Sequence, residues 1–169
     1  FADTYDAAIL RSVRQLPGVL AVEPMRSAPV ILSAGPRSQR DSLLGIPADA
    51  RLNRVLDGEE RPVPPRTDGL TIARVLARKL DVEVGDVVRV QSTDGRRRVL
   101  EIPVVAIVDP FVGAPAYLEL DTLNRLLQEP ERVTAAYLLV DARAREAFSR
   151  EVKRLPAIAG VTYADNAEG

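Results

Sequence analysis

The chain has 169 residues, of which 46% are apolar and 28% are charged, a balance that is typical of a globular protein and excludes a disordered chain. Its formal net charge is −1, which gives no electrostatic basis for binding nucleic acid or an anionic membrane surface. Cysteine and histidine are both absent, so disulfides, thiolate metal sites and the commonest general base are excluded. The apolar runs fall short of the roughly 18 residues that cross a membrane.

The N-terminal region predicts a helix and then a strand. Apolar residues recur at helical spacing over residues 1 to 16, and Pro17 and Gly18 end this helix. Residues 19 to 23 favour a strand. Because the sequence begins inside a helical pattern at Phe1, without methionine or a signal peptide, we expect it to be cut from a longer chain.

A hairpin and a linker are expected next. Residues 29 to 34 and 38 to 46 favour two strands, joined by a Gly-Pro turn. Residues 48 to 56 favour a short helical turn. Residues 57 to 68 contain three prolines and alternating charges, so they are expected to be extended and exposed.

The stretch of residues 69 to 90 predicts a helix, a tight turn and a strand. Thr71 can cap the helix, and the apolar residues after it fall on one helical face. The glycine that follows can take a positive φ, and the aspartate after it can accept hydrogen bonds from backbone N–H groups. We therefore predict a structural motif that starts a small β-barrel. The residues of this motif are Leu70, Leu76, Ala77, Leu80, Gly85 and Asp86.

A second hairpin follows, with strands over residues 87 to 92 and 97 to 108 joined by an Asp-Gly turn. Pro103 lies in the returning strand and predicts an edge or a bulge there. The arginines at positions 96 to 98 allow two interpretations. In the first, they bind a phosphate or a lipid headgroup. In the second, they are solvated at the hairpin tip. We favour the second interpretation, because no aromatic residue or further basic run accompanies them.

The loop over residues 109 to 115 places apolar side chains between two strands. If they are exposed, Phe111, Val112 and Pro115 form a contact surface for a partner or for lipid. The alternative, which we favour for Phe111 and Val112, is that the loop folds back and closes one end of the barrel.

The C-terminal part predicts alternating strands and helices. Asp121 and Asp141 each precede a helix and can cap it. The expected elements are a strand over residues 117 to 119, a helix over 122 to 127, a strand over 134 to 140, a helix over 142 to 155 and a strand over 161 to 164.

A short repeat relates the two ends of the chain. Leu16-Pro17-Gly18-Val19 follows the first predicted helix, and Leu155-Pro156-Ala157-Ile158 follows the last. A helix–strand unit of this kind cannot bury its apolar face alone, so the two units are expected to pack side by side on one sheet.

We therefore predict an α+β fold of two lobes. Residues 1 to 47 and 130 to 169 form an α+β sandwich lobe built from both chain ends. Residues 66 to 129 form a small, barrel-like β-rich lobe inserted into it, and residues 48 to 65 form the linker.

Motifs of catalysis and cofactor binding are absent from the sequence. There is no phosphate-binding glycine loop, no dinucleotide fingerprint, no nucleophile elbow and no Asp-rich calcium loop. Ser149 and Lys153 lie one helical turn apart, but on the polar side of an amphipathic helix, where they are solvated. We expect no catalytic residue, no cofactor, no metal and no enzymatic activity.

Short segments in a fixed order along nearly the whole chain carry a family resemblance. They are Leu16-Pro17-Gly18-Val19, Val22-Glu23-Pro24, Leu44-Gly45-Ile46-Pro47, Gly69-Leu70-Thr71-Ile72 with Leu76-Ala77 and Leu80, Val84-Gly85-Asp86-Val87-Val88, and Tyr117-Leu118 with Leu123-Asn124. In this order and spacing the chain resembles the extracytoplasmic domain of FtsX-like ABC-transporter permeases, the group that includes the MacB-like periplasmic core domain.

The resemblance implies a non-catalytic domain that couples the motion of membrane helices to export or extraction of a substrate, or to an extracytoplasmic partner. The ATPase is then a separate cytoplasmic subunit or domain, reached through the membrane part. Other implied partners are the transmembrane helices of the same permease, a second permease copy, and an extracytoplasmic substrate or adaptor protein. The implied location is the periplasmic side of the bacterial inner membrane, within an integral membrane protein.

Two other classes of function stay open. The helix, Gly-Asp turn and strand also resemble the Gly-Asp box of cradle-loop barrels, some of which bind nucleic acid or another protein, although the net charge of −1 argues against nucleic acid. The second class is an enzyme whose two carboxylates, about 5–10 Å apart, meet in a deep cleft.

Overall fold

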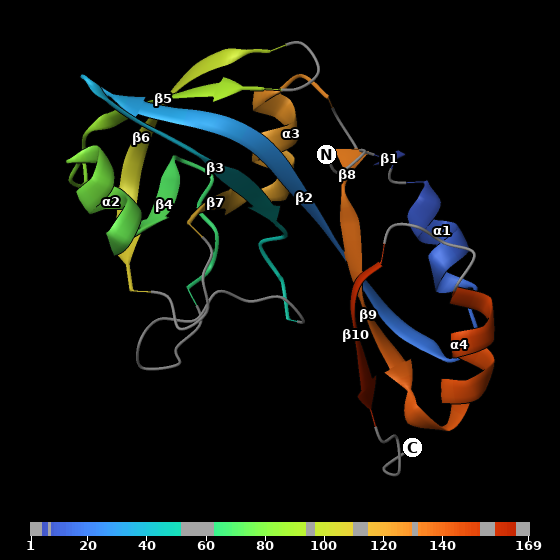
Figure 1. The fold of residues 1–169 in the computed structure, drawn as a ribbon. Coiled ribbons are helices and arrows are strands. Elements are labelled where there is room, and N and C mark those ends of the chain that lie inside the picture. Colours follow the sequence, from blue (N-terminus) through green and yellow to red (C-terminus); the bar gives the residue numbers. More distant parts are fainter. Residues whose placement is uncertain are drawn as a thin grey trace.

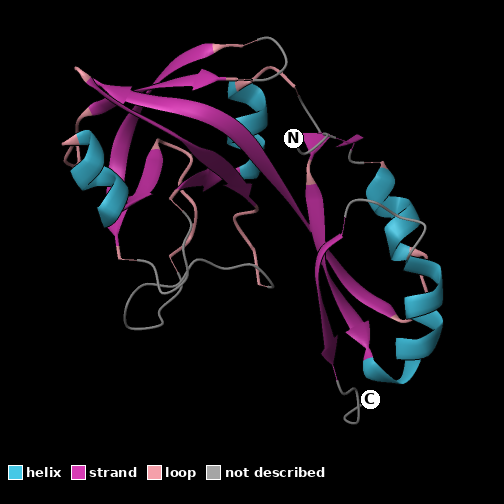
Figure 2. Cartoon of the chain, viewed as in Figure 1, coloured by secondary structure: helices cyan, strands magenta, loops and turns pink. Residues whose placement is uncertain are grey.

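The computed structural model describes residues 5–6, 8–51, 63–93, 97–109, 115–129, 132–152 and 158–164. The strands are β1 (Tyr5–Asp6), β2 (Val19–Ala34), β3 (Arg37–Ile46), β4 (Leu70–Ala73), β5 (Val87–Ser92), β6 (Val99–Val108), β7 (Ala116–Glu119), β8 (Arg132–Val133), β9 (Ala135–Asp141) and β10 (Ile158–Ala164). The helices are α1 (Ile9–Arg14), α2 (Arg74–Leu80), α3 (Leu120–Leu126), α4 (Arg145–Val152) and the 3-10 turn η1 (Ala142–Ala144). Figures 1 and 2 show a barrel at one end of the molecule and a sheet covered by helices at the other.

The barrel consists of β2, β3, β7, β4, β6 and β5 in that order, and it closes because β5 pairs back with β2. Alternate residues of the strands point inward, as the regular alternation of exposed and buried side chains along β5 shows. Both α2 and α3 pack against this part of the molecule and contribute apolar side chains to one core cluster. Members of this barrel core include Val30, Leu32, Leu43, Leu70, Ile72, Leu76, Leu80, Val88 and Leu123.

The second part is a sheet of β10, β9 and the first half of β2, with α1 and α4 on one face (Figure 1). A separate apolar cluster joins Val13 of α1 and Phe148 of α4 to the side chains of β9. The strands that follow the two related helices therefore share one sheet, with β9 between them. This arrangement confirms the predicted α+β fold, in which an α+β sandwich made from both chain ends accompanies a barrel-like part.

Strand β2 belongs to both parts of the molecule. Its residues from Val19 to Met25 pair with β9, and those from Arg26 to Ala34 pair with β3. The strand is 16 residues long, so a single extended segment runs from the sandwich into the barrel (Figure 1). The second half of β2 and β3 contribute to the barrel core, whereas the sequence groups them with the other lobe. The exact lobe boundaries stay a prediction.

The Gly-Asp turn joins α2 to β5. Gly85 has a φ of +102°, as the turn requires, and its N–H donates to the carbonyl of Val104 over 2.9 Å. The Asp86 carboxylate accepts a hydrogen bond of 2.8 Å from the N–H of Glu83, and the Asp86 carbonyl accepts one of 2.8 Å from the N–H of Val104. The turn thus holds the end of α2 against β6.

Two predicted helix starts are wrong. Tyr5–Asp6 form β1, which pairs with β8, and the first helix begins only at Ile9. Thr71 lies within β4, and α2 begins after Ala73, which makes no side-chain capping bond. In both cases long-range strand pairing overrides the local helical spacing of apolar residues.

The cap of α3 differs from the prediction, and Pro103 fits only one of its two predicted alternatives. Glu119, not Asp121, is the N-cap of α3, because its carboxylate accepts the free backbone N–H groups of the first turn. β6 lies between β4 and β5, so Pro103 is not on an edge strand. Pro103 pairs with Val87 at the end of the β5 ladder. The β4 ladder begins one residue later, at Val104, and its register shifts there, so an irregularity of the bulge type lies next to Pro103.

Candidate functional site

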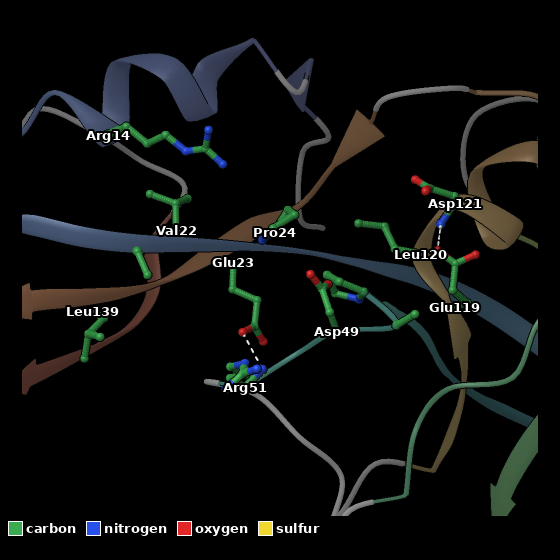
Figure 3. Close-up of a pocket in the computed structure, with 13 residues that line it drawn as sticks. Arg14, Val22, Glu23, Pro24, Asp49, Arg51, Glu119, Leu120, Asp121 and Leu139 are labelled. Atoms are coloured by element: carbon green, nitrogen blue, oxygen red, sulfur yellow. Dashed lines mark hydrogen bonds between the residues drawn. The ribbon is translucent and has the colours of Figure 1, made fainter.

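A cleft of about 570 Å³ opens beside β2, where the sandwich adjoins the barrel (Figure 3). Residues of α1, β2 and β9 line one part of it, and the segment after β3 and the start of α3 line the other. The lining residues are Arg14, Ala21, Val22, Glu23, Pro24, Pro47, Ala48, Asp49, Arg51, Glu119, Leu120, Asp121 and Leu139.

On the β2 side, the carboxylate of Glu23 binds the backbone of the segment that follows β3. Its side chain is only 8% exposed, and Oε2 accepts a hydrogen bond of 2.8 Å from the N–H of Arg51 (Figure 3). A buried carboxylate is tolerated when it is hydrogen-bonded in this way. Asp49 and Arg14 are exposed at the edge of the cleft, and Arg14 extends from the α1 side of β2.

On the barrel side, Glu119 is occupied with capping α3. Its Oε1 accepts from the Thr122 N–H over 3.0 Å and from the Thr122 hydroxyl over 2.8 Å, and Oε2 accepts from the Asp121 N–H over 2.9 Å. The Glu119 N–H in turn donates to the carbonyl of Arg66 over 3.0 Å, which anchors the end of the linker. These bonds satisfy donors that a helix start leaves free.

The two buried carboxylates of the cleft therefore hold backbone in place. General acid–base catalysis needs a carboxyl group that can reach a substrate proton, whereas Glu23 and Glu119 already accept backbone N–H groups. Within the described ranges, no group of three or more acidic, histidine or cysteine side chains could hold a metal ion.

The predicted motif residues do not line this cleft. Leu70, Leu76, Ala77 and Leu80 are buried in the barrel core, and Gly85 and Asp86 are exposed in the turn. Pro115 is half-buried, and its carbonyl accepts a hydrogen bond of 2.9 Å from the Ala73 N–H. Phe111, Val112, the arginine at position 96 and residues 52 to 62 lie outside the described residues, so both interpretations of the loop stay predictions. Arg97 is exposed, whereas Arg98 is half-buried and donates a hydrogen bond of 2.6 Å to Gln128 Oε1.

The sequence reading missed a buried polar cluster next to the cleft. Arg26 is 1% exposed, and its guanidinium donates to Asn124 Oδ1 over 2.7 Å and to Glu129 Oε1. The Asn124 amide donates to the carbonyl of Arg132 over 3.1 Å. Asn124 and Glu129 lie 98 and 103 residues away from Arg26 in the chain. The one local signal is an arginine in the interior of an otherwise mostly uncharged strand.

The fold is similar to that of the extracellular domain of an ABC-type transporter, and this confirms, at the level of the fold, the resemblance noted in the sequence. One similar solved structure is the extracellular domain of the noncanonic ABC-type transporter YknZ from Gram-positive bacteria. The TM-score is 0.57 and the sequence identity 16%, over 90% of this chain and 82% of that one. No protein-family model and no curated protein matches the sequence. Of the described helices, none has the length and apolar character to cross a membrane.

Proposed function

We propose that this chain is a non-catalytic extracytoplasmic domain of an ABC-transporter permease. The observation that carries the proposal is the fold likeness to the YknZ extracellular domain over 90% of the chain. The use of the cleft carboxylates as backbone acceptors supports a role without catalysis. The net charge of −1 argues against a barrel that binds nucleic acid.

The mechanism that we propose is mechanical coupling. Membrane helices joined to the two chain ends would move the sandwich, which both ends build. Strand β2 would pass this motion to the barrel, because its backbone continues without a break from one apolar core into the other. A hydrogen-bonded strand resists stretching far better than a flexible linker does, so β2 suits a rigid connection.

The partners in this proposal follow from that position. The domain acts with the transmembrane helices of its own permease and, through them, with a cytoplasmic ATPase subunit and a second permease copy. An extracytoplasmic substrate or adaptor protein would contact the exposed surfaces. We propose the cleft beside Glu23 and Asp49 as one such surface, because it is lined by both parts of the molecule and would change shape when they move.

The location can be tested by cysteine labelling of the full-length gene product in cells. The 169 residues contain no cysteine, so a single cysteine at the exposed Arg40 reports on this domain alone once labelling of the parent protein is subtracted. A membrane-impermeant maleimide should label the Arg40→Cys protein in intact cells. A cysteine in the cytoplasmic ATPase subunit is the control and should react only after lysis.

Labelling at Arg40→Cys only after lysis would overturn the proposal. The nucleic-acid alternative is tested separately by measuring DNA affinity against salt concentration. A clear negative slope of log affinity against log salt would favour that alternative, because such a slope measures the release of counterions from phosphates.

A further inference from the structure

The junction between the two parts of the molecule falls at one peptide bond of β2. Met25 is the last residue that pairs with β9, opposite Ala135, and Arg26 is the first that pairs with β3, opposite Gly45. None of the described strands pairs with β2 on both sides of this bond. Ladder hydrogen bonds therefore do not fix the angle between the sandwich and the barrel, and other contacts must do so.

The side chain of Arg26 supplies such contacts at the junction itself. It bonds Asn124, which lies on α3, and Glu129, which follows α3. Helix α3 packs on β3 and β7, and its Leu123 lies in the barrel core. The guanidinium therefore ties the junction of β2 to the barrel side.

The same cluster continues into the sandwich side. The Asn124 amide donates to the carbonyl of Arg132, in the strand β8 that leads into β9. The Thr134 hydroxyl accepts from the Ser27 N–H over 2.9 Å and donates to the Ser27 carbonyl over 3.3 Å. These bonds bridge the strand that leads into the sandwich to α3 and to the barrel half of β2.

Because the Arg26 guanidinium is buried, its hydrogen bonds depend strongly on the positions of their acceptors. A planar guanidinium presents its donors in a fixed fork, and a buried charge that loses its partners leaves an uncompensated group behind. Among the described residues, nothing accepts from Arg26 Nε, so the bonds to Asn124 and Glu129 supply the hydrogen bonding that the structure gives to this buried charge. Rotation of the barrel relative to the sandwich would strain the bond from the Asn124 amide to the Arg132 carbonyl. The bonds from Arg26 hold Asn124 in the position that this bond requires.

We propose that Arg26 and Glu129 hold Asn124 against the carbonyl of Arg132, and that this interlobe clasp sets the angle between the sandwich and the barrel. This inference rests on the proposed function for its biological use: a domain that transmits motion needs its two parts to move together. Arg26 is then a positioning residue, acting through the orientation of the Asn124 amide.

The clasp is tested by measuring the distance between the two parts with pulsed electron spin resonance. Because the chain lacks cysteine, spin labels can be attached at Arg40→Cys on β3 and Arg150→Cys on α4, both of which are exposed. The clasp variants are Arg26→Met, which has a similar length and cannot bond, and Glu129→Ala. The control is Asp109→Ala, which removes an exposed ion pair with Arg74 within the barrel.

The doubly labelled parent chain is expected to give one narrow distance distribution. Each clasp variant should widen it by at least about twofold, because a charge pair inside the junction is lost, while Asp109→Ala leaves it unchanged. Parent-like distributions in the clasp variants, or equal widening in the control, would overturn the inference. If Arg26→Met fails to fold by circular dichroism, Glu129→Ala decides by the same criterion, since its side chain is 32% exposed and leaves little cavity.

This measurement is independent of the membrane location. It uses the 169-residue chain in solution, so a failed labelling experiment in cells would leave a positive distance result in place. Conversely, an unchanged distance distribution in the clasp variants would refute the proposed clasp without affecting the proposed permease function.

Discussion

Replacing Gly85 by valine tests whether the Gly-Asp turn organises the barrel. Gly85 has a φ of +102°, a backbone conformation that L-residues with a branched Cβ rarely adopt. A Cβ built at this position meets no atom within 4 Å. The main cost of Gly85→Val is therefore backbone strain, because the added Cβ does not clash.

The magnitude follows from the strain of holding a non-glycine residue in such a region, which is about 1–3 kcal/mol. We expect Gly85→Val to lower the free energy of unfolding by about 2 kcal/mol, because valine is β-branched. For a chain of this size such a loss lowers the melting temperature by about 4–8 °C. If the turn relaxes instead, the bond from the Gly85 N–H to the Val104 carbonyl is lost.

The assay is urea unfolding followed by circular dichroism. The matched control is Glu83→Val, which places the same side chain at an exposed position of the same turn. Glu83 is not among the described residues with a positive φ, so its variant should stay within about 0.5 kcal/mol of the parent. Equal stability of the two variants would refute the argument that strain at Gly85 defines this turn.

Three further predictions concern the barrel and its helices. Leu80→Ala should lower the free energy of unfolding by about 2–5 kcal/mol in urea, because Leu80 is buried in the barrel core. Glu119→Ala should cost about 0.5–2 kcal/mol, and Asp121→Ala almost nothing, because Glu119 makes the capping bonds of α3; the reverse order would contradict this cap. Burial raises the pKa of Tyr117 above its usual range, so ultraviolet titration should show a difference from a free phenol, namely one tyrosine that stays protonated above the usual pKa. In Tyr117→Phe this difference should disappear.

The Tyr117 shift also gives a sign for alkaline stability. The folded chain binds the phenol proton more tightly than the unfolded chain does, so the contribution of this group is fully present below the unfolded pKa of about 10. It is lost as the pH rises above that value. The parent chain should therefore lose more stability than Tyr117→Phe between neutral pH and strongly alkaline pH, and parallel losses would contradict the raised pKa.

Local patterns in the sequence were sufficient to predict most of the helices and strands. The alternation along β5 and the spacing of Leu76, Ala77 and Leu80 depend on whether each side chain faces the core, and that is a short-range property. The positive φ of Gly85 was predictable for the same reason, since a tight turn constrains its own few residues. The repeat of helix and strand at the two chain ends indicated the sandwich.

The wrong predictions concern features that depend on contacts with other elements of the fold. Tyr5 and Asp6 carry a helical pattern, but β8, more than 120 residues later in the chain, draws them into a strand. Glu119 caps α3 in place of the predicted Asp121, because β7 continues directly into the helix. The residue at the end of the strand therefore lies next to the free N–H groups of the first turn.

The sequence by itself determined the class of fold, the barrel motif and the absence of cysteine and histidine chemistry, because these depend on composition and on neighbours within about one turn or one hairpin. Only the tertiary structure decided that β2 changes partners between Met25 and Arg26, that the cleft opens there, and that Arg26 meets Asn124 and Glu129. The physical reason is distance along the chain. A buried charge needs a partner, but the sequence does not specify which of its many acidic and amide side chains folding will bring to it.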